Sequence, residues 1–273
     1  MINLSYWLIN ILFIFIVSLD YKKDQTQLTW KTFLPIGLLL LLIIGFLFSK
    51  SATFWYWIVN FFLIDSHLWN WNQLFSQIPF NDGALFRLYK PKLFTLFMRW
   101  VYDYGFILAW GASVIRSFLT RSAGKMIRYT LSSHMLQLPI IVPFYATVML
   151  QEVWYVKGNP DGMARHLSGD ELLETVQNCF PSMHTSVSFA ILLLALRENG
   201  RLFKWGMVTY CSLVIFSTLY LEIHWVLDVL GGILLGYVAV KMVDWVTLIY
   251  HQRKKNHPIL QSCLKKERNI KKP

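Results

Sequence analysis

Residues 179–184 read Cys-Phe-Pro-Ser-Met-His, and the chain then continues without a charged side chain to Leu196. Proline and serine are common at the start of a helix, where a serine side chain caps free backbone N–H groups. An uncharged apolar run behind such a start predicts a membrane-crossing helix over 181–196. The free amides at its beginning also predict a place where an anion binds.

The rest of the chain has the same apolar character. Of 273 residues, 55% are hydrophobic and only 15% are charged, whereas about a quarter of the residues in a soluble domain are charged. The apolar residues form long uncharged runs, which predicts an all-α fold, a polytopic bundle of membrane helices. We expect seven spans, over 1–19, 33–48, 100–119, 129–153, 181–196, 205–221 and 223–240.

The segments between these runs differ in character. Residues 52–64 are too short to cross a membrane and hold Trp and Tyr, which predicts an interfacial position, and 65–99 should form amphipathic surface segments. Arg116 lies close enough to the end of its span to reach water, and Pro139 and Pro143 should kink the fourth span. The expected parts are N-terminal spans and interfacial segments over 1–100, a catalytic core over 101–250 and a basic tail over 251–273.

The charge pattern predicts the orientation. The net charge is +11, and the tail from His251 onward holds eight Lys or Arg against one Glu. By the positive-inside rule this tail is cytoplasmic, and the loop over 152–179 lies on the extracytoplasmic side. The basic residues from Arg87 to Arg99 fall on that side as well, against the rule. Nucleic acid is not an expected partner, because no recognition motif accompanies the charge.

A second polar stretch lies at the same expected membrane level. Residues 217–228 read Ser-Thr-Leu-Tyr-Leu-Glu-Ile-His-Trp-Val-Leu-Asp. On a helix, His224 and Asp228 would share one face, and the aspartate would fix the imidazole tautomer so that the other ring nitrogen can attack. His184 could protonate a leaving alcohol. The sequence thus predicts His184, His224 and Asp228 as catalytic, with a proton path in a transporter or channel as the alternative.

A phosphate between these histidines would need ligands. Ser182 and the Met183 amide at the helix start are candidates, and so are Arg165 and Lys157 in the preceding loop, because a guanidinium can clamp two oxygens of a phosphoryl group. A lone loop arginine is also commonly a solvated surface residue. No His-x-x-x-His pair or clustered carboxylates occur and the three cysteines are scattered, so we expect no metal and no cofactor.

These residues resemble the type-2 phosphatidic acid phosphatase superfamily. Pro181-Ser182-Met183-His184 is similar to its Pro-Ser-Gly-His motif, and Ser217-Thr218-x5-His224-x3-Asp228 is similar to its Ser-Arg-x5-His-x3-Asp motif. The resemblance covers about 129–240. It implies a core of six membrane helices, to which this chain adds an N-terminal span. It also implies that His224 attacks phosphorus, Asp228 orients it and His184 protonates the leaving group.

Two departures from that pattern resemble a particular branch. Thr218 stands where the superfamily has arginine, and Lys157 and Arg165 are separated by seven residues instead of six. Both are similar to the inositol phosphorylceramide synthase branch, as are residues 158–165, 180–184 and 217–221. That branch moves a phospho-headgroup from one lipid to the hydroxyl of another. We therefore expect an integral membrane phosphoryl-transfer enzyme whose partner is a membrane lipid phosphate, joined by a hydroxyl acceptor lipid if the reaction is a transfer, with hydrolysis and transfer both open.

Overall fold

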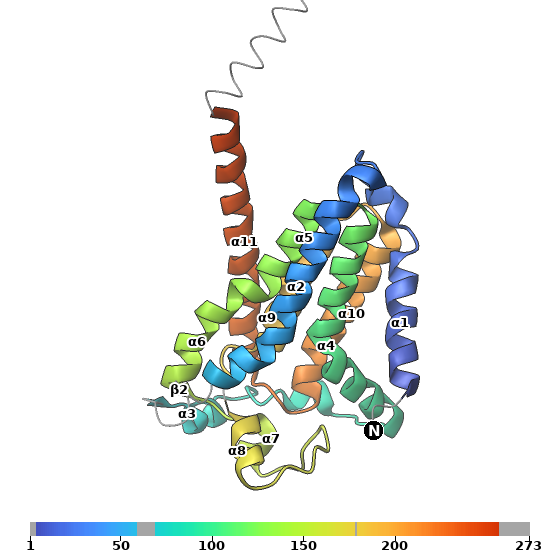
Figure 1. Ribbon diagram of the computed structural model, residues 1–273. Helices are drawn as coiled ribbons and strands as arrows, with labels where there is room; N and C mark the ends of the chain where they lie inside the picture. The colour runs from blue at the N-terminus through green and yellow to red at the C-terminus, as the bar shows by residue number, and fades with distance from the viewer. Residues whose placement is uncertain (1–3, 59–68, 178, 257–273) are drawn as a thin grey trace, which may run out of the picture.

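The computed structural model describes residues 4–58, 69–177 and 179–256, and in these ranges the chain is mostly helical (Figure 1). A short parallel ladder joins β1 (Trp69–Asn70) to β2 (Val148–Met149). The α-helices are α1 (Leu4–Ser18), α2 (Trp30–Ile58), α3 (Asn72–Gln77), α4 (Lys92–Leu119), α5 (Ala123–Thr130), α6 (Gln137–Thr147), α7 (Val153–Lys157), α8 (Gly169–Val176), α9 (Met183–Ala195), α10 (Arg201–Tyr220) and α11 (Val226–Asn256). The predicted all-α bundle is confirmed.

Within the described ranges, three helical segments are long and apolar enough to cross a membrane: Trp30–Lys50, Arg201–Tyr220 and Val226–Tyr250. Two further segments, Tyr6–Ser18 and Met183–Ala195, are apolar but shorter. All five lie on predicted spans. The prediction for 52–64 was partly wrong, because α2 continues without a break to Ile58, and 59–64 lies outside the described residues.

The remaining two predicted spans are interrupted helices. α4 is kinked at Gly105. The fourth span does not run over 129–153 as predicted: it begins earlier with α5, passes through the π-helix η4 (Leu131–Met135) and ends with α6. Its break lies just before Pro139, which lacks the N–H that would bond back into the preceding turn. Pro143 lies inside α6 as expected.

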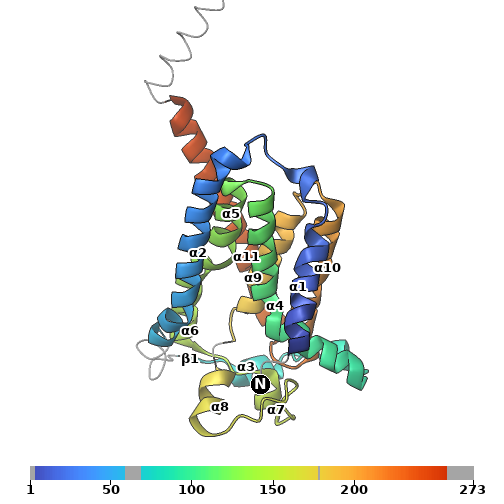
Figure 2. The same ribbon diagram turned by 45° about the vertical axis from the view of Figure 1, so that its right-hand side comes forward.

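α9 lies at the centre of the bundle, against α10 on one side and α11 on the other (Figures 1 and 2). Glycines in α11 permit this close approach. A Cβ at Gly232 would lie 2.6 Å from the Ser182 carbonyl oxygen, and one at Gly236 would overlap the carbonyl oxygen of Ser186. The small residues therefore allow α9, which begins with the first motif, and α11, which carries Asp228, to pack with their backbones almost in contact.

The two ends of the bundle differ. At one end, the pocket end, α3, α7 and α8 lie close to the start of α9; at the other, the distal end, lie the α1–α2 link and the start of α5 (Figure 2). Two of the four basic residues that violated the charge rule are paired at the pocket end. Arg87 pairs with Asp82 at 3.0 Å and with Glu222 at 3.4 Å, and Lys90 pairs with Glu222 at 2.6 Å. The charges of these two residues are thus balanced within the fold.

Arg116 at the distal end does not reach toward water, so that prediction was wrong. Its side chain is only 2% exposed and pairs with Asp20 at 2.7 Å and Asp24 at 2.5 Å. The link between α1 and α2, which includes the 3-10 helix η1 (Tyr21–Asp24), brings both carboxylates over the end of α4. A buried guanidinium is stable here because these partners accept hydrogen bonds from both of its terminal nitrogens, although Nε has no partner among the described residues.

Candidate active site

The start of α9 is capped as the sequence predicts. Ser182 is the N-cap residue, and its Oγ accepts a hydrogen bond from the Thr185 N–H at 3.3 Å. The Ser182 N–H in turn donates to the Asp228 carbonyl oxygen at 3.4 Å, which ties the beginning of α9 to that of α11. The next two amides, of Met183 and His184, belong to the first helical turn and have no acceptor within the helix.

His224 does not share a helix with Asp228, so this part of the prediction was wrong. α11 begins at Val226, and His224 lies in the turn before it. The side chains nevertheless meet, with His224 Nδ1 and Asp228 Oδ2 2.5 Å apart. A residue just before a helix can contact the first turn, so the spacing of four works without helical geometry at the histidine. Asp228 is fully buried and fixes the ring so that Nε2 is free.

The two histidine rings converge from neighbouring elements. Their centroids are 6.2 Å apart, at an interplanar angle of 50°. Two aromatic rings of α4 hold His184 in place: Tyr102 stacks on it at 4.2 Å, and Phe106 meets it edge-on at 4.9 Å. This separation brings both imidazoles within reach of a single group of phosphate size.

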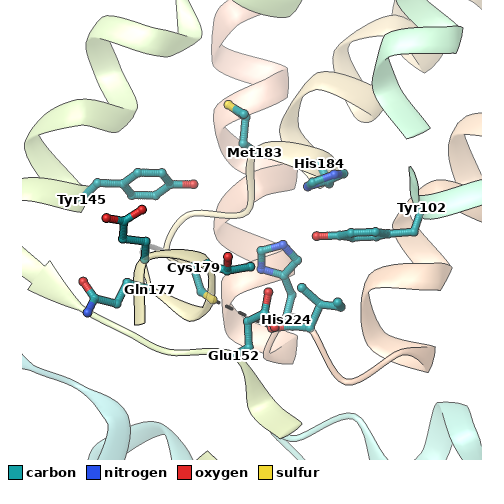
Figure 3. A pocket seen from close by; sticks show the side chains of 11 residues that line it. Tyr102, Tyr145, Glu152, Gln177, Cys179, Met183, His184 and His224 are labelled. Carbon is teal, nitrogen blue, oxygen red and sulfur yellow. Dashed lines mark hydrogen bonds between the residues drawn. The ribbon is translucent and has the colours of Figure 1, made fainter. Parts of the chain in front are cut away.

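A pocket of about 270 Å³ opens beside these rings (Figure 3). Such a volume fits a phosphorylated headgroup and leaves lipid chains outside, since pockets that enclose whole drug-sized ligands are larger. Its lining combines both histidines with further polar, sulfur-containing and aromatic side chains. The lining residues are Tyr102, Tyr145, Glu152, Glu174, Thr175, Gln177, Cys179, Met183, His184, Ile223 and His224.

Arg165 lies behind one pocket wall and is separated from the cavity by Glu152. Its NH1 donates to Glu152 Oε1 at 3.1 Å and its NH2 to Glu152 Oε2, while Nε donates to Asp161 Oδ2 at 2.9 Å. Burial lowers the pKa of Arg165, but the two carboxylates outweigh it and raise the pKa above its ordinary value. The guanidinium is therefore a fixed cation beside the pocket, and the carboxylate that holds it lines the cavity.

The loop that carries Arg165 is fastened to the turn before His224. Asn159 Nδ2 donates to Glu222 Oε2 at 2.5 Å, and Gly162 packs so closely on Leu221 that a Cβ there would overlap the Leu221 carbonyl oxygen. Glu222 has a φ of 62°, a left-handed conformation that costs a non-glycine residue about 1 kcal/mol or more. Its ionic partners hold this turn, and the turn aims the following histidine at the pocket.

Lys157 and Thr218 are placed differently from the other motif residues. Lys157 is exposed, and its Nζ donates to the Ser76 carbonyl oxygen at 3.3 Å, away from the pocket lining. Thr218 Oγ1 donates to the Ile215 carbonyl oxygen at 2.7 Å, so its hydroxyl turns back onto its own helix. The structure thus brings His184, His224, Asp228 and Met183 together, with Arg165 close behind and Lys157 apart.

Several pocket residues carried no sequence signal as site residues. Tyr102 stood within an apolar run, Tyr145 near a proline kink, and Glu152 entered only as one acid of a loop. Cys179 directly precedes the first motif, and burial, followed by the Asp228 and Glu152 charges, raises the pKa of its thiol. A weak signal was available for Cys179 alone, in its position next to the motif.

A comparison with protein families matches residues 141–257 to the PAP2 superfamily. No curated protein and no solved structure matches the chain. The matched range contains α9, α10 and α11 and includes all three predicted catalytic residues. The match covers less than half of the chain, so it shows a similarity to this superfamily over that range.

Proposed function

We propose that this chain is an integral membrane enzyme that transfers a phosphoryl group from a lipid-linked phosphate through a phosphohistidine at His224. One observation carries the proposal. The imidazoles of His184 and His224 lie 6.2 Å apart at one pocket, and His224 alone of the two is bonded through Nδ1 to a buried carboxylate, that of Asp228. The His184 ring is thereby suited to acid–base catalysis, and the His224 ring to nucleophilic attack on phosphorus.

In the first step, His224 Nε2 attacks phosphorus, and the bond between phosphorus and the lipid alkoxide oxygen breaks. Protonated His184 gives its proton to that oxygen, so a neutral alcohol leaves. Asp228 accepts the Nδ1–H bond and stabilises the positive charge that develops on the attacking ring. In the second step, His184 takes a proton from water or an acceptor hydroxyl, whose oxygen attacks phosphorus and releases His224.

Charge on the transferred group needs stabilisation in both steps. The Met183 and His184 amides at the start of α9 can donate to phosphate oxygens, and Ser182 still has its hydroxyl proton to donate. Arg165 serves if it exchanges part of its pairing with Glu152 for a phosphate oxygen, a bidentate contact that suits transferring phosphoryl groups. These groups supply charge stabilisation from the protein itself. Lys157, which is exposed and apart from the pocket, has the weakest support of the predicted ligands.

We place the pocket on the extracytoplasmic face and the C-terminal tail in the cytoplasm, on the strength of the charge pattern. A test uses Lys157→Cys in a chain whose Cys263 is Ser, since Cys179 and Cys211 are buried. Labelling by an impermeant thiol reagent added outside intact cells supports this orientation. Labelling only after lysis reverses it.

The acceptor decides between a lipid phosphatase and a headgroup phosphotransferase similar to inositol phosphorylceramide synthase. The purified chain is given either phosphatidic acid alone or a phosphoinositide donor with a lipid that has a free hydroxyl. Release of inorganic phosphate identifies the phosphatase. A new phospholipid without equivalent phosphate release identifies the transferase.

The mechanism itself is tested with His224→Gln and His184→Gln, and with His166→Gln as the matched control because His166 is exposed. With a lipid donor labelled in its phosphate, the wild-type chain should trap an acid-labile, base-stable phosphoprotein, and His224→Gln should trap none. Both site variants should lose turnover while the control keeps it. Near-normal turnover in either site variant would overturn the assigned roles.

The competing function is a transporter or channel in which His224 and Asp228 conduct protons. In proteoliposomes it predicts a proton flux that His224→Gln changes, without any trapped phosphoprotein. The enzyme predicts a trapped phosphoprotein and no such flux.

A further inference from the structure

Three neighbouring side chains, two of which line the pocket, have donor atoms that suit a transition metal. One donor atom each from Cys179, His224 and Asp228 lies within 4.8 Å of the other two. Cys179 comes from the segment before α9, His224 from the turn after α10 and Asp228 from the first turn of α11. Sulfur, imidazole nitrogen and carboxylate oxygen together are a typical ligand set for Zn²⁺.

A second observation at the same place points to a missing partner. Asp228 Oδ2 bonds to His224, but Oδ1 of the same fully buried carboxylate has no hydrogen-bond partner among the described residues. A buried carboxylate oxygen without a partner is unfavourable and calls for an explanation. A cation between this oxygen, the thiol and the imidazole would satisfy it.

We propose that Cys179, His224 and Asp228 form an inhibitory site for Zn²⁺ or a similar thiophilic divalent cation. The ion enters through the pocket, which Cys179 and His224 line (Figure 3). On binding, the Cys179 thiol gives its proton to water and a sulfur–metal bond forms. The His224 Nδ1 proton moves through pocket water to Nε2, bonds from the metal to Nδ1 and to the carboxylate replace the Nδ1–Oδ2 hydrogen bond, and a pocket water completes the coordination.

The required movement is small. Tetrahedral zinc places its ligand atoms roughly 3.3–3.7 Å apart, given bond lengths of about 2.0–2.3 Å. The present limit of 4.8 Å therefore needs a contraction of about 1.5 Å at most. The positive charge of the ion also reverses the electrostatics that keep the thiol protonated, because a coordinating thiol loses its proton.

The functional consequence rests on the proposed role of His224 as nucleophile. A metal that occupies its ring and its orienting carboxylate stops both attack and proton control. Zn²⁺ should inhibit turnover, and removal of the ion by a chelator should restore it. The cysteine does not take part in the proposed reaction, so it is the residue through which metal binding can be separated from catalysis.

The experiment uses Co²⁺ as a spectroscopic probe on the full chain in detergent, with Cys263→Ser as the background. One equivalent of Co²⁺ should give a thiolate-to-cobalt charge-transfer absorption that Zn²⁺ displaces. Cys179→Ser should abolish this absorption and weaken Zn²⁺ binding by about tenfold or more, since even outer partners of a metal site change affinity by about 10–100-fold. Cys211→Ser is the matched control, a buried cysteine inside α10.

Absence of the charge-transfer absorption in the Cys263→Ser background overturns the proposal. This measurement does not depend on whether a variant of the site residues folds. Equal Zn²⁺ affinity in Cys179→Ser and Cys211→Ser overturns it as well. The two proposals also fail separately. A cobalt–thiolate absorption in a chain without lipid turnover supports the metal site and contradicts the proposed enzymatic function. Lipid turnover without this absorption supports the enzymatic function and contradicts the metal site.

Discussion

Arg116 and Arg165 lie near opposite ends of the bundle, and each guanidinium binds two carboxylates. Arg116 pairs with Asp20 and Asp24, and Arg165 with Glu152 and Asp161. The two sites differ in access. The Arg116 side chain is 2% exposed, whereas that of Arg165 is 21% exposed and one of its partners lines the pocket.

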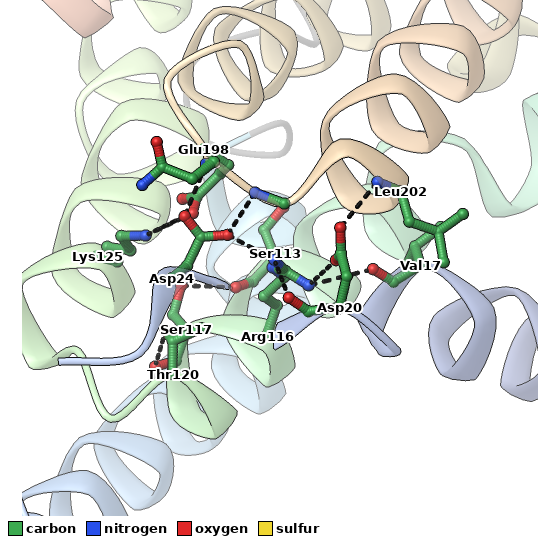
Figure 4. A network of polar contacts seen from close by, with 12 residues as sticks. Val17, Asp20, Asp24, Ser113, Arg116, Ser117, Thr120, Lys125, Glu198 and Leu202 are labelled. Atoms are coloured by element: carbon green, nitrogen blue, oxygen red, sulfur yellow. Dashed lines mark hydrogen bonds and ion pairs between the residues drawn. The ribbon is translucent and has the colours of Figure 1, made fainter. Parts of the chain in front are cut away.

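The Arg116 cluster joins segments that are distant in sequence (Figure 4). Asp24 accepts hydrogen bonds from the Asn199 and Gly200 amides at 2.7 and 2.9 Å, and Asp20 accepts one from the Leu202 amide at 2.8 Å. The guanidinium also lies over the Phe203 ring at 4.6 Å. The contacts of Arg116 are thus with other parts of the same buried cluster, and they hold the helix ends at the distal end together.

The comparison teaches that the number of ion pairs does not separate a structural arginine from a functional one. What separates them is whether a ligand can replace a partner. At Arg116 the guanidinium is buried and no ligand can reach it, whereas at Arg165 the cavity beside Glu152 offers room for a second anion. We therefore predict that loss of Arg116 changes stability and that loss of Arg165 changes turnover.

The largest expected effect is on stability. Arg116→Met removes the guanidinium that bridges Asp20 and the buried Asp24 and leaves Asp24 with Lys125 alone, at 3.7 Å, which should cost about 3–5 kcal/mol of unfolding free energy. Thermal unfolding in detergent measures it. A variant that also carries Asp20→Asn and Asp24→Asn should recover part of the loss, because the unpaired charges are gone. A single variant that unfolds within a degree of the wild-type chain would contradict the structural role.

The next effect is on the reaction. Arg165→Met should lower turnover of a lipid phosphate by about 10²–10³-fold, as loss of one donor to a developing oxyanion does. Its unfolding temperature should fall less than that of Arg116→Met, because Arg165 is partly exposed. Arg165→Lys should recover only part of the rate, since an ammonium cannot clamp two oxygens. Unchanged turnover in Arg165→Met would remove it from the site.

A smaller effect concerns acid stability at the distal end. Burial raises the pKa of Asp24, but bonds from the Asn199 amide, Arg116 and the Gly200 amide outweigh it and lower the pKa from 3.8 to about 2. Because the folded pKa lies below the unfolded one, this stabilisation is full above about pH 4 and is lost as pH falls toward 2; its size is about 1–2 kcal/mol. Unfolding temperatures measured between about pH 5 and 3 should fall more steeply for wild type than for Asp24→Asn. If the unfolding temperatures of wild type and Asp24→Asn fall in parallel with pH, Asp24 does not contribute to acid stability in this way.

Much of the fold followed from the sequence, because uninterrupted apolar runs mark helices regardless of their neighbours. The positions of α1, α2, α9, α10 and α11 were predicted in this way. The kink at Gly105 and the π-helix before Pro139 were not, since they depend on how the surrounding helices pack. The pairing of Arg116 was missed for the same reason: its carboxylates lie about 90 residues earlier in the chain.

For the site, motif spacing was informative and pocket composition was not. The spacing of four between His224 and Asp228 predicted their contact, although the histidine precedes the helix. Tyr102 and Glu152 reach the pocket only through tertiary packing, so no local pattern identifies them. The roles of Arg165 and Lys157 stay predictions, and the variants of Arg165 decide the first.

The smallest expected effect isolates the exchange of partners at Arg165. Glu152→Gln removes the carboxylate that competes with phosphate for the guanidinium, so inorganic phosphate should inhibit turnover about three- to tenfold more strongly, or about 0.7–1.4 kcal/mol, within the range for a hydrogen bond to a charged group. The matched control is Asp161→Asn. Asp161 also binds Arg165, but it lies outside the pocket lining and accepts the Met163 and Arg165 amides, so its loss should loosen the loop and weaken phosphate inhibition. Opposite shifts in the two variants support an arginine that changes partners. If both variants shift inhibition the same way, Glu152 is a structural partner like Asp20 and Asp24, and the difference between the two arginines disappears.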